Sequence, residues 1–322
     1  MKWIVAPLAC ALLTALPARP ADAAFARRSY TAGHFALELD GKMVGFLRSV
    51  EGGGVKADVI EERPGESSNT VKKHIGWPKF EDIKIEVGLD GSLELFDWVH
   101  SFFEGAGARK NGAIVAADYN YKERARHEFH DALITEIGVP ALDGSSKDPA
   151  YLKITLSPDS LLDKAGSGAP LPPVPSAKQK TWSTSNFRLK LGDLPCSRIR
   201  SIGAFTVVQH TTTYQDGANA TPVKVPGRLE FPNLRFTVSN LDAKPWIDWG
   251  DAFLVQGKSG DGSELEGSLT LLDPKGGTLA EIGLHHVGLT GLTTLPSVAS
   301  GEPSQPLTVE VYTEAMDFVR TP

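Results

Sequence analysis

The feature that most constrains the fold of this chain is a pattern that occurs twice, about 152 residues apart. Segments 35–41 and 187–193 both begin with Phe and alternate apolar with polar residues. Three later landmarks also recur: strand-like segments 83–87 and 234–238, Asp-Trp pairs at 97–98 and 248–249, and segments 152–156 and 307–311. Counted from Phe35, Ile83, Trp98 and Leu152 lie 48, 63 and 117 residues further along the chain. Counted from Phe187, Leu234, Trp249 and Leu307 lie 47, 62 and 120 residues further along. Because unrelated stretches do not keep such spacing, the sequence predicts a duplicated domain.

The hydrophobic periodicity of each copy predicts strands with one helix among them. Period-two alternation predicts strands over 35–39, 44–50, 57–62, 83–87, 113–119, 128–137 and 151–156, then over 187–191, 199–209, 227–229, 234–238, 264–272, 278–287 and 307–312. Spacings of three and four predict helices over 92–103 and near 245–255, anchored in the core by Trp98 and Trp249. The predicted fold class is mainly β with one helix per domain (α+β), as two tandem β-sandwich or barrel domains.

A segment rich in proline and glycine separates the two copies. The predicted order is a first domain over 34–163, a linker over 164–183 and a second domain over 184–319. At 322 residues the chain is long enough for two domains, each burying its own core.

The first 23 residues have the pattern of a secretory signal peptide. Lys2 supplies a positive start, residues 3–16 are apolar, and Ala21-Asp22-Ala23 forms a cleavage site before Ala24. The expected location is therefore periplasmic or secreted, with no membrane span after signal removal. Cys10 leaves lipidation open as an alternative.

Charge and cysteine content exclude several classes of function. The formal net charge of −6 argues against binding to nucleic acid by bulk electrostatics. After signal removal only Cys196 remains, so no internal disulfide can form. We expect Cys196 to be an ordinary, partly buried residue rather than a nucleophile.

The sequence carries no strong catalytic motif. His127 and His130 lie three residues apart in a predicted strand and so point to opposite faces, and the adjacent His285 and His286 are expected at a surface or interface. Glu61 could serve a glycosidase only if another carboxylate faced it across a cleft. We therefore predict no catalytic residue, no cofactor and no metal site.

The first copy resembles the bacteriophage tail tube protein family. The resemblance rests on the order of short segments: a strand that ends in Asp40-Gly41, then Gly45-Phe46, an acidic strand with a basic end over 58–63, a basic segment over 71–76, and a helix with Trp98. It covers nearly all of residues 34–160. The second copy departs from the pattern, because 205–209 lacks the acidic residues and its following loop is rich in threonine.

The resemblance implies a sandwich or barrel with one helix that assembles by sheet extension into six-fold rings, which stack into a hollow tube. In such proteins the loop that corresponds to residues 63–74 reaches the neighbouring ring. It carries the candidate interface residues Arg63, Glu66, Lys72 and Lys73. An ordinary solvated hairpin loop is the alternative for this segment.

The sequence thus predicts a secreted structural protein of phage-tail-tube type, whose partner is a further copy of itself and which assembles through sheet edges. The duplication suggests that three copies form a pseudo-hexameric ring. The alternative function is a secreted enzyme acting on the cell envelope, or a carbohydrate-binding β-sandwich.

Overall fold

The computed structural model describes residues 33–62, 71–172, 182–214, 222–294 and 306–321. The predicted signal peptide, Arg63, Glu66 and the middle of the predicted linker lie outside these residues. In the described part, no helix combines the length and the apolar character needed to cross a membrane.

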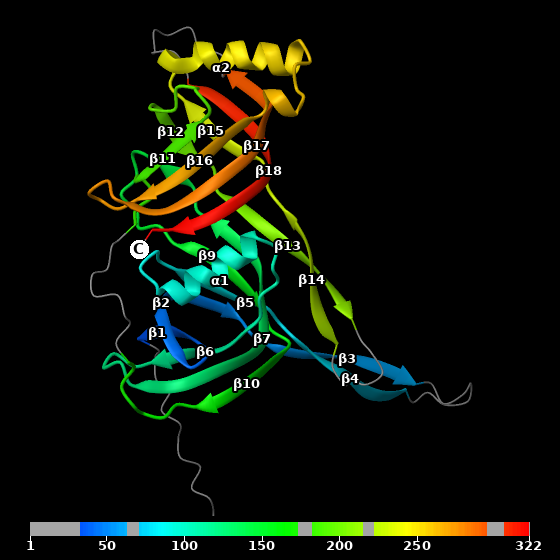
Figure 1. Ribbon diagram of the computed structural model, residues 1–322. Coiled ribbons are helices and arrows are strands. Elements are labelled where there is room, and N and C mark those ends of the chain that lie inside the picture. Colours follow the sequence, from blue (N-terminus) through cyan, green and yellow to red (C-terminus); the bar gives the residue numbers. More distant parts are fainter. Residues whose placement is uncertain (1–32, 63–70, 173–181, 215–221, 295–305, 322) are drawn as a thin grey trace, which may run out of the picture. The chain divides into compact units, whose positions relative to one another are not determined.

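Six strands of the first half close into a barrel. They are β1 (His34–Leu39), β2 (Lys42–Gly52), β5 (Ile83–Val87), β6 (Lys110–Ala117), β7 (Glu123–Val139) and β9 (Leu152–Ser157). Their order is β7-β6-β1-β2-β5-β9, and β9 pairs with β7 again to complete the circle (Figure 1). The alternating residues predicted to face inward supply its core, as expected for a small barrel filled by side chains.

The second half repeats this strand order in an open sheet. Its strands are β11 (Phe187–Leu191), β12 (Ile199–Ile202), β15 (Leu234–Val238), β16 (Leu265–Leu272), β17 (Thr278–Thr294) and β18 (Leu307–Arg320). The order β11-β16-β17-β18-β15-β12 corresponds to β1-β6-β7-β9-β5-β2, but β11 and β12 do not pair with each other. The mainly β fold class is confirmed, and the shared order supports the predicted duplication.

Each half contributes a strand to the sheet of the other half. β13 (Phe205–Tyr214), which pairs with β14 (Val223–Glu230), also pairs with β7 of the barrel. In return, β8 (Leu142–Asp143) pairs with β12 at the end of the open sheet. Residues 32–322 consequently form one compact unit, because strands of the two halves pair with each other.

Two further strand segments belong to the first half. β3 (Val55–Glu62) and β4 (Lys72–Phe80) form a two-stranded sheet of their own (Figure 1). β10 (Ser160–Ala165) pairs with the first part of β7. The first two residues of the predicted linker are therefore part of a strand.

Each half carries one α-helix, as predicted. α1 (Leu93–Phe103) buries Trp98, whose indole N–H donates to Ala108 O at 2.9 Å. α2 (Ala243–Gly250) follows the short turn η1 (Asn240–Asp242) and continues into a π-helical turn, η2 (Asp251–Val255); another short turn, η3 (Asp261–Ser263), precedes β16. Here Trp246, fully buried, takes the innermost position, whereas Trp249 is only partly buried. Trp249, predicted to anchor this helix in the core, packs against the core from its edge, and Trp246 one turn earlier is the buried anchor.

The structure also divides a strand that the sequence predicts as continuous over 199–209. The chain leaves β15 at Gly203 and Ala204, and its continuation, β13, joins β7 instead. Because periodicity describes one strand at a time, it does not show where a strand changes its neighbour.

Candidate functional site

The most informative site of the described chain is the junction at which β13 extends the first-half barrel. Four antiparallel pairs join the two strands, from Phe205↔Val139 to Val208↔Glu136. Val207 pairs with Ile137, and both side chains are buried. The junction therefore has the hydrogen-bonded backbone and the apolar inner face of a sheet interior.

Arg109 fixes the junction from the side. Its Nη1 donates to Asp159 Oδ2 at 2.7 Å and to the carbonyl oxygen of Asp131 at 2.8 Å, and its Nη2 donates to the carbonyl oxygen of Lys224 on β14. The Arg109 and Asp159 side chains are 27% and 18% exposed. Because the pair is partly screened from water, it holds β14 more firmly than a surface ion pair does.

Lys224 of β14 completes the junction with its own polar groups. Its backbone N–H donates to Asp159 Oδ1 at 3.3 Å, and its ammonium group donates to Ser157 Oγ at 2.6 Å and to Asp82 Oδ1 at 3.2 Å. One lysine of the second half is thus bound by four side chains of the first half, those of Arg109, Asp159, Ser157 and Asp82.

Several other strand edges, including those of β11, β17 and β3, lack a partner within the described part of the chain. Residues 288–294 of β17 pair with β18 on one side only, because β16 covers β17 no further than Val287. β3 pairs with β4 on one side only. Unpaired edges of this kind readily accept another strand.

The β3–β4 hairpin also exposes apolar side chains in an unusual number. Six are at least one-third exposed: Val55, Val59, Ile60, Val71, Ile75 and Trp77. Val55 itself is 58% exposed. Exposed apolar clusters of this kind are typical of surfaces that contact another molecule.

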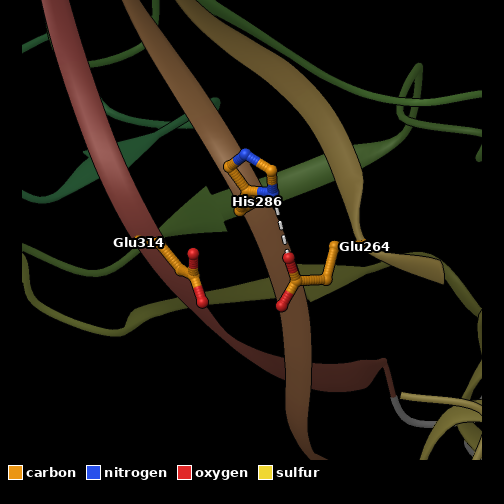
Figure 2. Close-up of side chains that lie close together, drawn as sticks. All are labelled: Glu264, His286 and Glu314. Carbon is orange, nitrogen blue, oxygen red and sulfur yellow. Dashed lines mark hydrogen bonds and ion pairs between the residues drawn. The ribbon is translucent and has the colours of Figure 1, made fainter. Parts of the chain in front are cut away.

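Glu264, His286 and Glu314 form the acidic cluster of the second half, and Figure 2 shows them converging from three neighbouring segments. Their potential ligand atoms all lie within 4.8 Å of one another, and His286 Nδ1 is 3.1 Å from Glu264 Oε2. The Glu264 side chain is only 6% exposed. Two carboxylates and an imidazole are ligands that Zn²⁺ accepts, so the donor set fits a metal ion as well as another cation.

Tyr312 supports the acidic cluster from β18. Its hydroxyl donates to Glu264 Oε1. Burial, together with this hydrogen bond, raises the pKa of Tyr312 to about 12. The phenol therefore stays protonated at neutral pH and remains a donor to the carboxylate.

His285 is held by two carboxylates. Its Nε2 is 2.7 Å from Asp317 Oδ2 and its Nδ1 is 2.7 Å from Glu266 Oε2. These hydrogen bonds, that to Asp317 first, raise the pKa of His285, and the bond from His285 lowers the pKa of Glu266. The expected surface position of His285 and His286 agrees with their partial exposure, but the carboxylates around them could not be identified from the sequence.

Of the four predicted interface residues, the structure describes Lys72 and Lys73. Both lie at the start of β4, where Lys73 Nζ is 3.6 Å from Glu61 Oε1. Arg63 and Glu66 lie outside the described residues. Among the residues predicted to have no special role, Cys196 is partly buried, which raises the pKa of its thiol.

One comparison with known proteins finds a family match in the first half of the chain. Residues 31–161 match the family model of the T4-like virus tail tube protein gp19, which confirms the resemblance for this part of the chain. No curated protein matches the chain.

Solved structures similar to part of this chain include chains of an extracellular contractile injection system and of the anti-feeding prophage. A chain of an extracellular contractile injection system, the PVC sheath-tube complex in the extended state, is 24% identical, with a TM-score of 0.39; the match covers 44% of this chain and 94% of that one. A chain of the tube-terminating cap of the anti-feeding prophage is 17% identical, with a TM-score of 0.34, covering 48% and 95%.

Proposed function

Because residues 31–161 are a domain of the tail tube family, we propose that the chain is a structural protein that assembles with copies of itself by strand pairing. In this proposal the free edge of β17 in one copy pairs with the start of β3 in the next. The observation that carries the proposal is the junction inside the chain. There β7, which corresponds to β17, already pairs with β13, which corresponds to β3.

The strand registers define which residues would meet. Leu292 of β17 pairs with Val309 as Ile137 of β7 pairs with Ile154. The β3–β4 and β13–β14 hairpins each contain a bulge. Val55 lies two residues before the register shift at Ala57, and Val207 lies two residues before the register shift at Gln209, so the two valines correspond. The junction between copies therefore pairs Val55 with Leu292, as Val207 pairs with Ile137 inside the chain.

Burial supports this pairing. Val207 is 0% exposed, whereas Val55, at the corresponding position, is 58% exposed in the single chain. Covering Val55 on association removes apolar surface from water, a contribution of roughly 1–2 kcal/mol per contact. The exposed hairpin is thus best explained as one half of an interface.

Three copies are the number that we propose for a closed ring. Each copy contains one internal junction between its two halves. It also offers a free β17 edge to one neighbour and a free β3 edge to the other. Three copies therefore place six halves around a ring, with first and second halves in alternation. Heterologous contacts of this kind either close into a ring or continue as a filament. The six-fold rings implied by the family resemblance favour closure with three duplicated chains.

Light scattering on the purified protein tests the proposal, with Val55→Asp as the disrupting variant. Its matched control is Val59→Asp on the same strand, because Val59 is similarly exposed and corresponds to Thr211, which stays exposed beside the internal junction. We expect about three chain masses for the wild type and for Val59→Asp, and one chain mass for Val55→Asp. A wild type that stays monomeric at high concentration refutes the proposal.

We further propose that the protein has no catalytic activity of its own. Two of the three carboxylates that line the hollow between β5, β7 and β9 are engaged by neighbours. Glu86 lies 3.7 Å from Lys153 and 3.8 Å from Arg48, and Glu136 accepts from the hydroxyl of Thr155 at 2.9 Å. Glycan hydrolysis by the purified protein, lost on Glu136→Gln, would contradict this part.

Export from the cytoplasm is also part of the proposal, and the sequence of residues 1–23 supports it. Mass spectrometry of the protein recovered from the periplasm or the medium tests it. The expected N-terminus is Ala24, whereas an intact Met1 in the cytoplasmic fraction contradicts export.

A further inference from the structure

The two halves share not only their strand order but also a bulge at one position. Asp131 in β7 and His286 in β17 lie 155 residues apart, and both have a positive φ, 50° and 51°. The backbone N–H of Asp131 donates to Asn111 Oδ1 at 2.8 Å, and that of His286 donates to Glu266 Oε1 at 3.2 Å. Because the acceptors are also 155 residues apart, residues on the strands around the bulge correspond one to one.

This correspondence places the acidic cluster where the first half has its arginine. Gly112 and Gly267 pair with Leu39 and Leu191 in the same register. Three positions before each glycine stand Arg109 and Glu264, so Glu264 takes the place of Arg109. Likewise Glu314 takes the place of Asp159, since β9–β10 and β18 follow the same register against β7 and β17.

A positive charge is therefore missing from the second-half position. In the first half the Arg109 guanidinium lies against Asp159. In the second half two carboxylates stand there, and Glu314 forms no ion pair within the described part of the chain. Glu264 and Glu314, with only His286 beside them, are therefore expected to attract a cation that the second half does not supply.

The hairpin that would cover this position carries such a cation. β14 pairs with β13 as β4 pairs with β3, including the bulge, so that Lys224 corresponds to Lys73. In the internal junction Lys224 Nζ donates to Ser157 Oγ and Asp82 Oδ1, and its backbone N–H donates to Asp159 Oδ1. In the second half Tyr312 and Glu314 occupy the places of Ser157 and Asp159. The hydroxyl of Tyr312 already donates to Glu264.

We propose that Glu264, Glu314 and Tyr312 form a socket for the ammonium group of Lys73 from a second copy of this chain. The inference rests on the proposed function, since it requires the same β17–β3 junction. Lys73 is available, because its pair with Glu61 is exposed, at 63% and 49% of the two side chains, and such pairs contribute little. The socket gives the junction a direction, since only the hairpin of a neighbouring copy supplies the cation.

Charge reversal tests the socket. Lys73→Glu should weaken self-association about tenfold or more, measured by sedimentation equilibrium, because it places a third carboxylate beside two others. Lys72→Glu is the matched control, since the neighbouring side chain points to the other face of β4, and it should change the association less than about threefold. The double variant Lys73→Glu/Glu314→Lys should recover most of the loss.

Direct coupling provides a second measurement. A carbodiimide joins an ammonium group to a carboxylate that it touches. With mixed ¹⁴N- and ¹⁵N-labelled protein, we expect a Lys73–Glu314 or Lys73–Glu264 bond between copies. Coupling of Lys73 only to Glu61 of its own chain overturns the socket.

The outcomes separate the socket from the assembly itself. A wild type that is monomeric refutes both. An assembly that Val55→Asp dissociates but Lys73→Glu leaves intact refutes the socket alone. If the cluster instead binds Zn²⁺ in titration calorimetry, loses it on His286→Ala, and the assembly dissociates on chelation, then the cluster is a metal site and the lysine socket is wrong.

Discussion

Val207 and Val55 occupy corresponding positions, one inside the chain and one on its surface, and this pair yields the sharpest prediction. Val207 is fully buried against Ile137 of β7, whereas Val55 is 58% exposed on β3. The same substitution, Val→Ala, should therefore have different effects at the two positions. At position 207 it should lower the stability of the single chain, and at position 55 it should weaken the association of chains.

The magnitudes follow from the buried methyl groups. Val207→Ala removes two of them from a packed interior, so the transfer and cavity contributions together cost about 2–3 kcal/mol of unfolding free energy. Val55→Ala removes the same groups from a surface position, so the monomer should change by less than about 0.5 kcal/mol. If Val55 is buried at the junction between copies, a loss of about 1.4 kcal/mol per contact weakens association about tenfold.

Two assays separate the effects. Urea unfolding at low protein concentration, where the chain is monomeric, gives the stability, and sedimentation equilibrium gives the association. Ile137→Val serves as a milder check on the internal junction. Equal loss of monomer stability in Val55→Ala and Val207→Ala would show that β3 is covered within its own chain, and would refute the argument from corresponding positions.

Three further predictions concern the junction, the histidine cluster and the strand packing. Arg109→Met leaves Asp159 and the Lys224 carbonyl without their donor and should cost about 1–3 kcal/mol in urea unfolding; an unchanged midpoint contradicts the role of Arg109. The carboxylate partners of His285 raise its pKa in the folded protein. Its contribution to folding stability is therefore complete below the unfolded pKa of 6.5 and is lost as pH rises through the folded pKa, so the melting-temperature difference between wild type and His285→Gln should shrink above pH 6.5. A difference that grows with pH contradicts the pairing. Gly267→Ala places a Cβ against the backbone oxygen of Lys190 and should cost about 1–3 kcal/mol in urea unfolding. Gly260→Ala, where a Cβ would meet open space, should stay within about 0.5 kcal/mol, and equal effects of the two substitutions would show that the sheet adjusts freely.

The sequence by itself determined most of the elements, and it predicts their repetition. Alternation fixed strands such as Ile83–Val87 and Leu234–Val238, and spacings of three and four fixed both helices, because a buried face imposes its period on the residues that form it. The tail tube resemblance of the first half likewise followed from short segments in a fixed order. Lys72 and Lys73 could be identified as interface candidates from that resemblance.

Two largely exposed strands, β4 and β10, escaped prediction, although the exposed β3 was predicted over 57–62. β4 is mostly exposed, contains Gly76 and Pro78, and shows no alternation. β10 is also polar. Such strands are stabilised by hydrogen bonds to the strand beside them, and the composition of a segment does not show which strand that is.

Only the tertiary structure decided which edges are paired and which are free. The pairing of β7 with β13 joins residues 66 or more positions apart, and residues 288–294 of β17 pair with β18 alone. The acidic cluster arises in the same way, since Glu264, His286 and Glu314 come from three segments and meet only because their strands are neighbours. Periodicity records which face of a strand is buried, but not which other strand lies beside it, and for this protein the neighbours of each strand define the proposed interface.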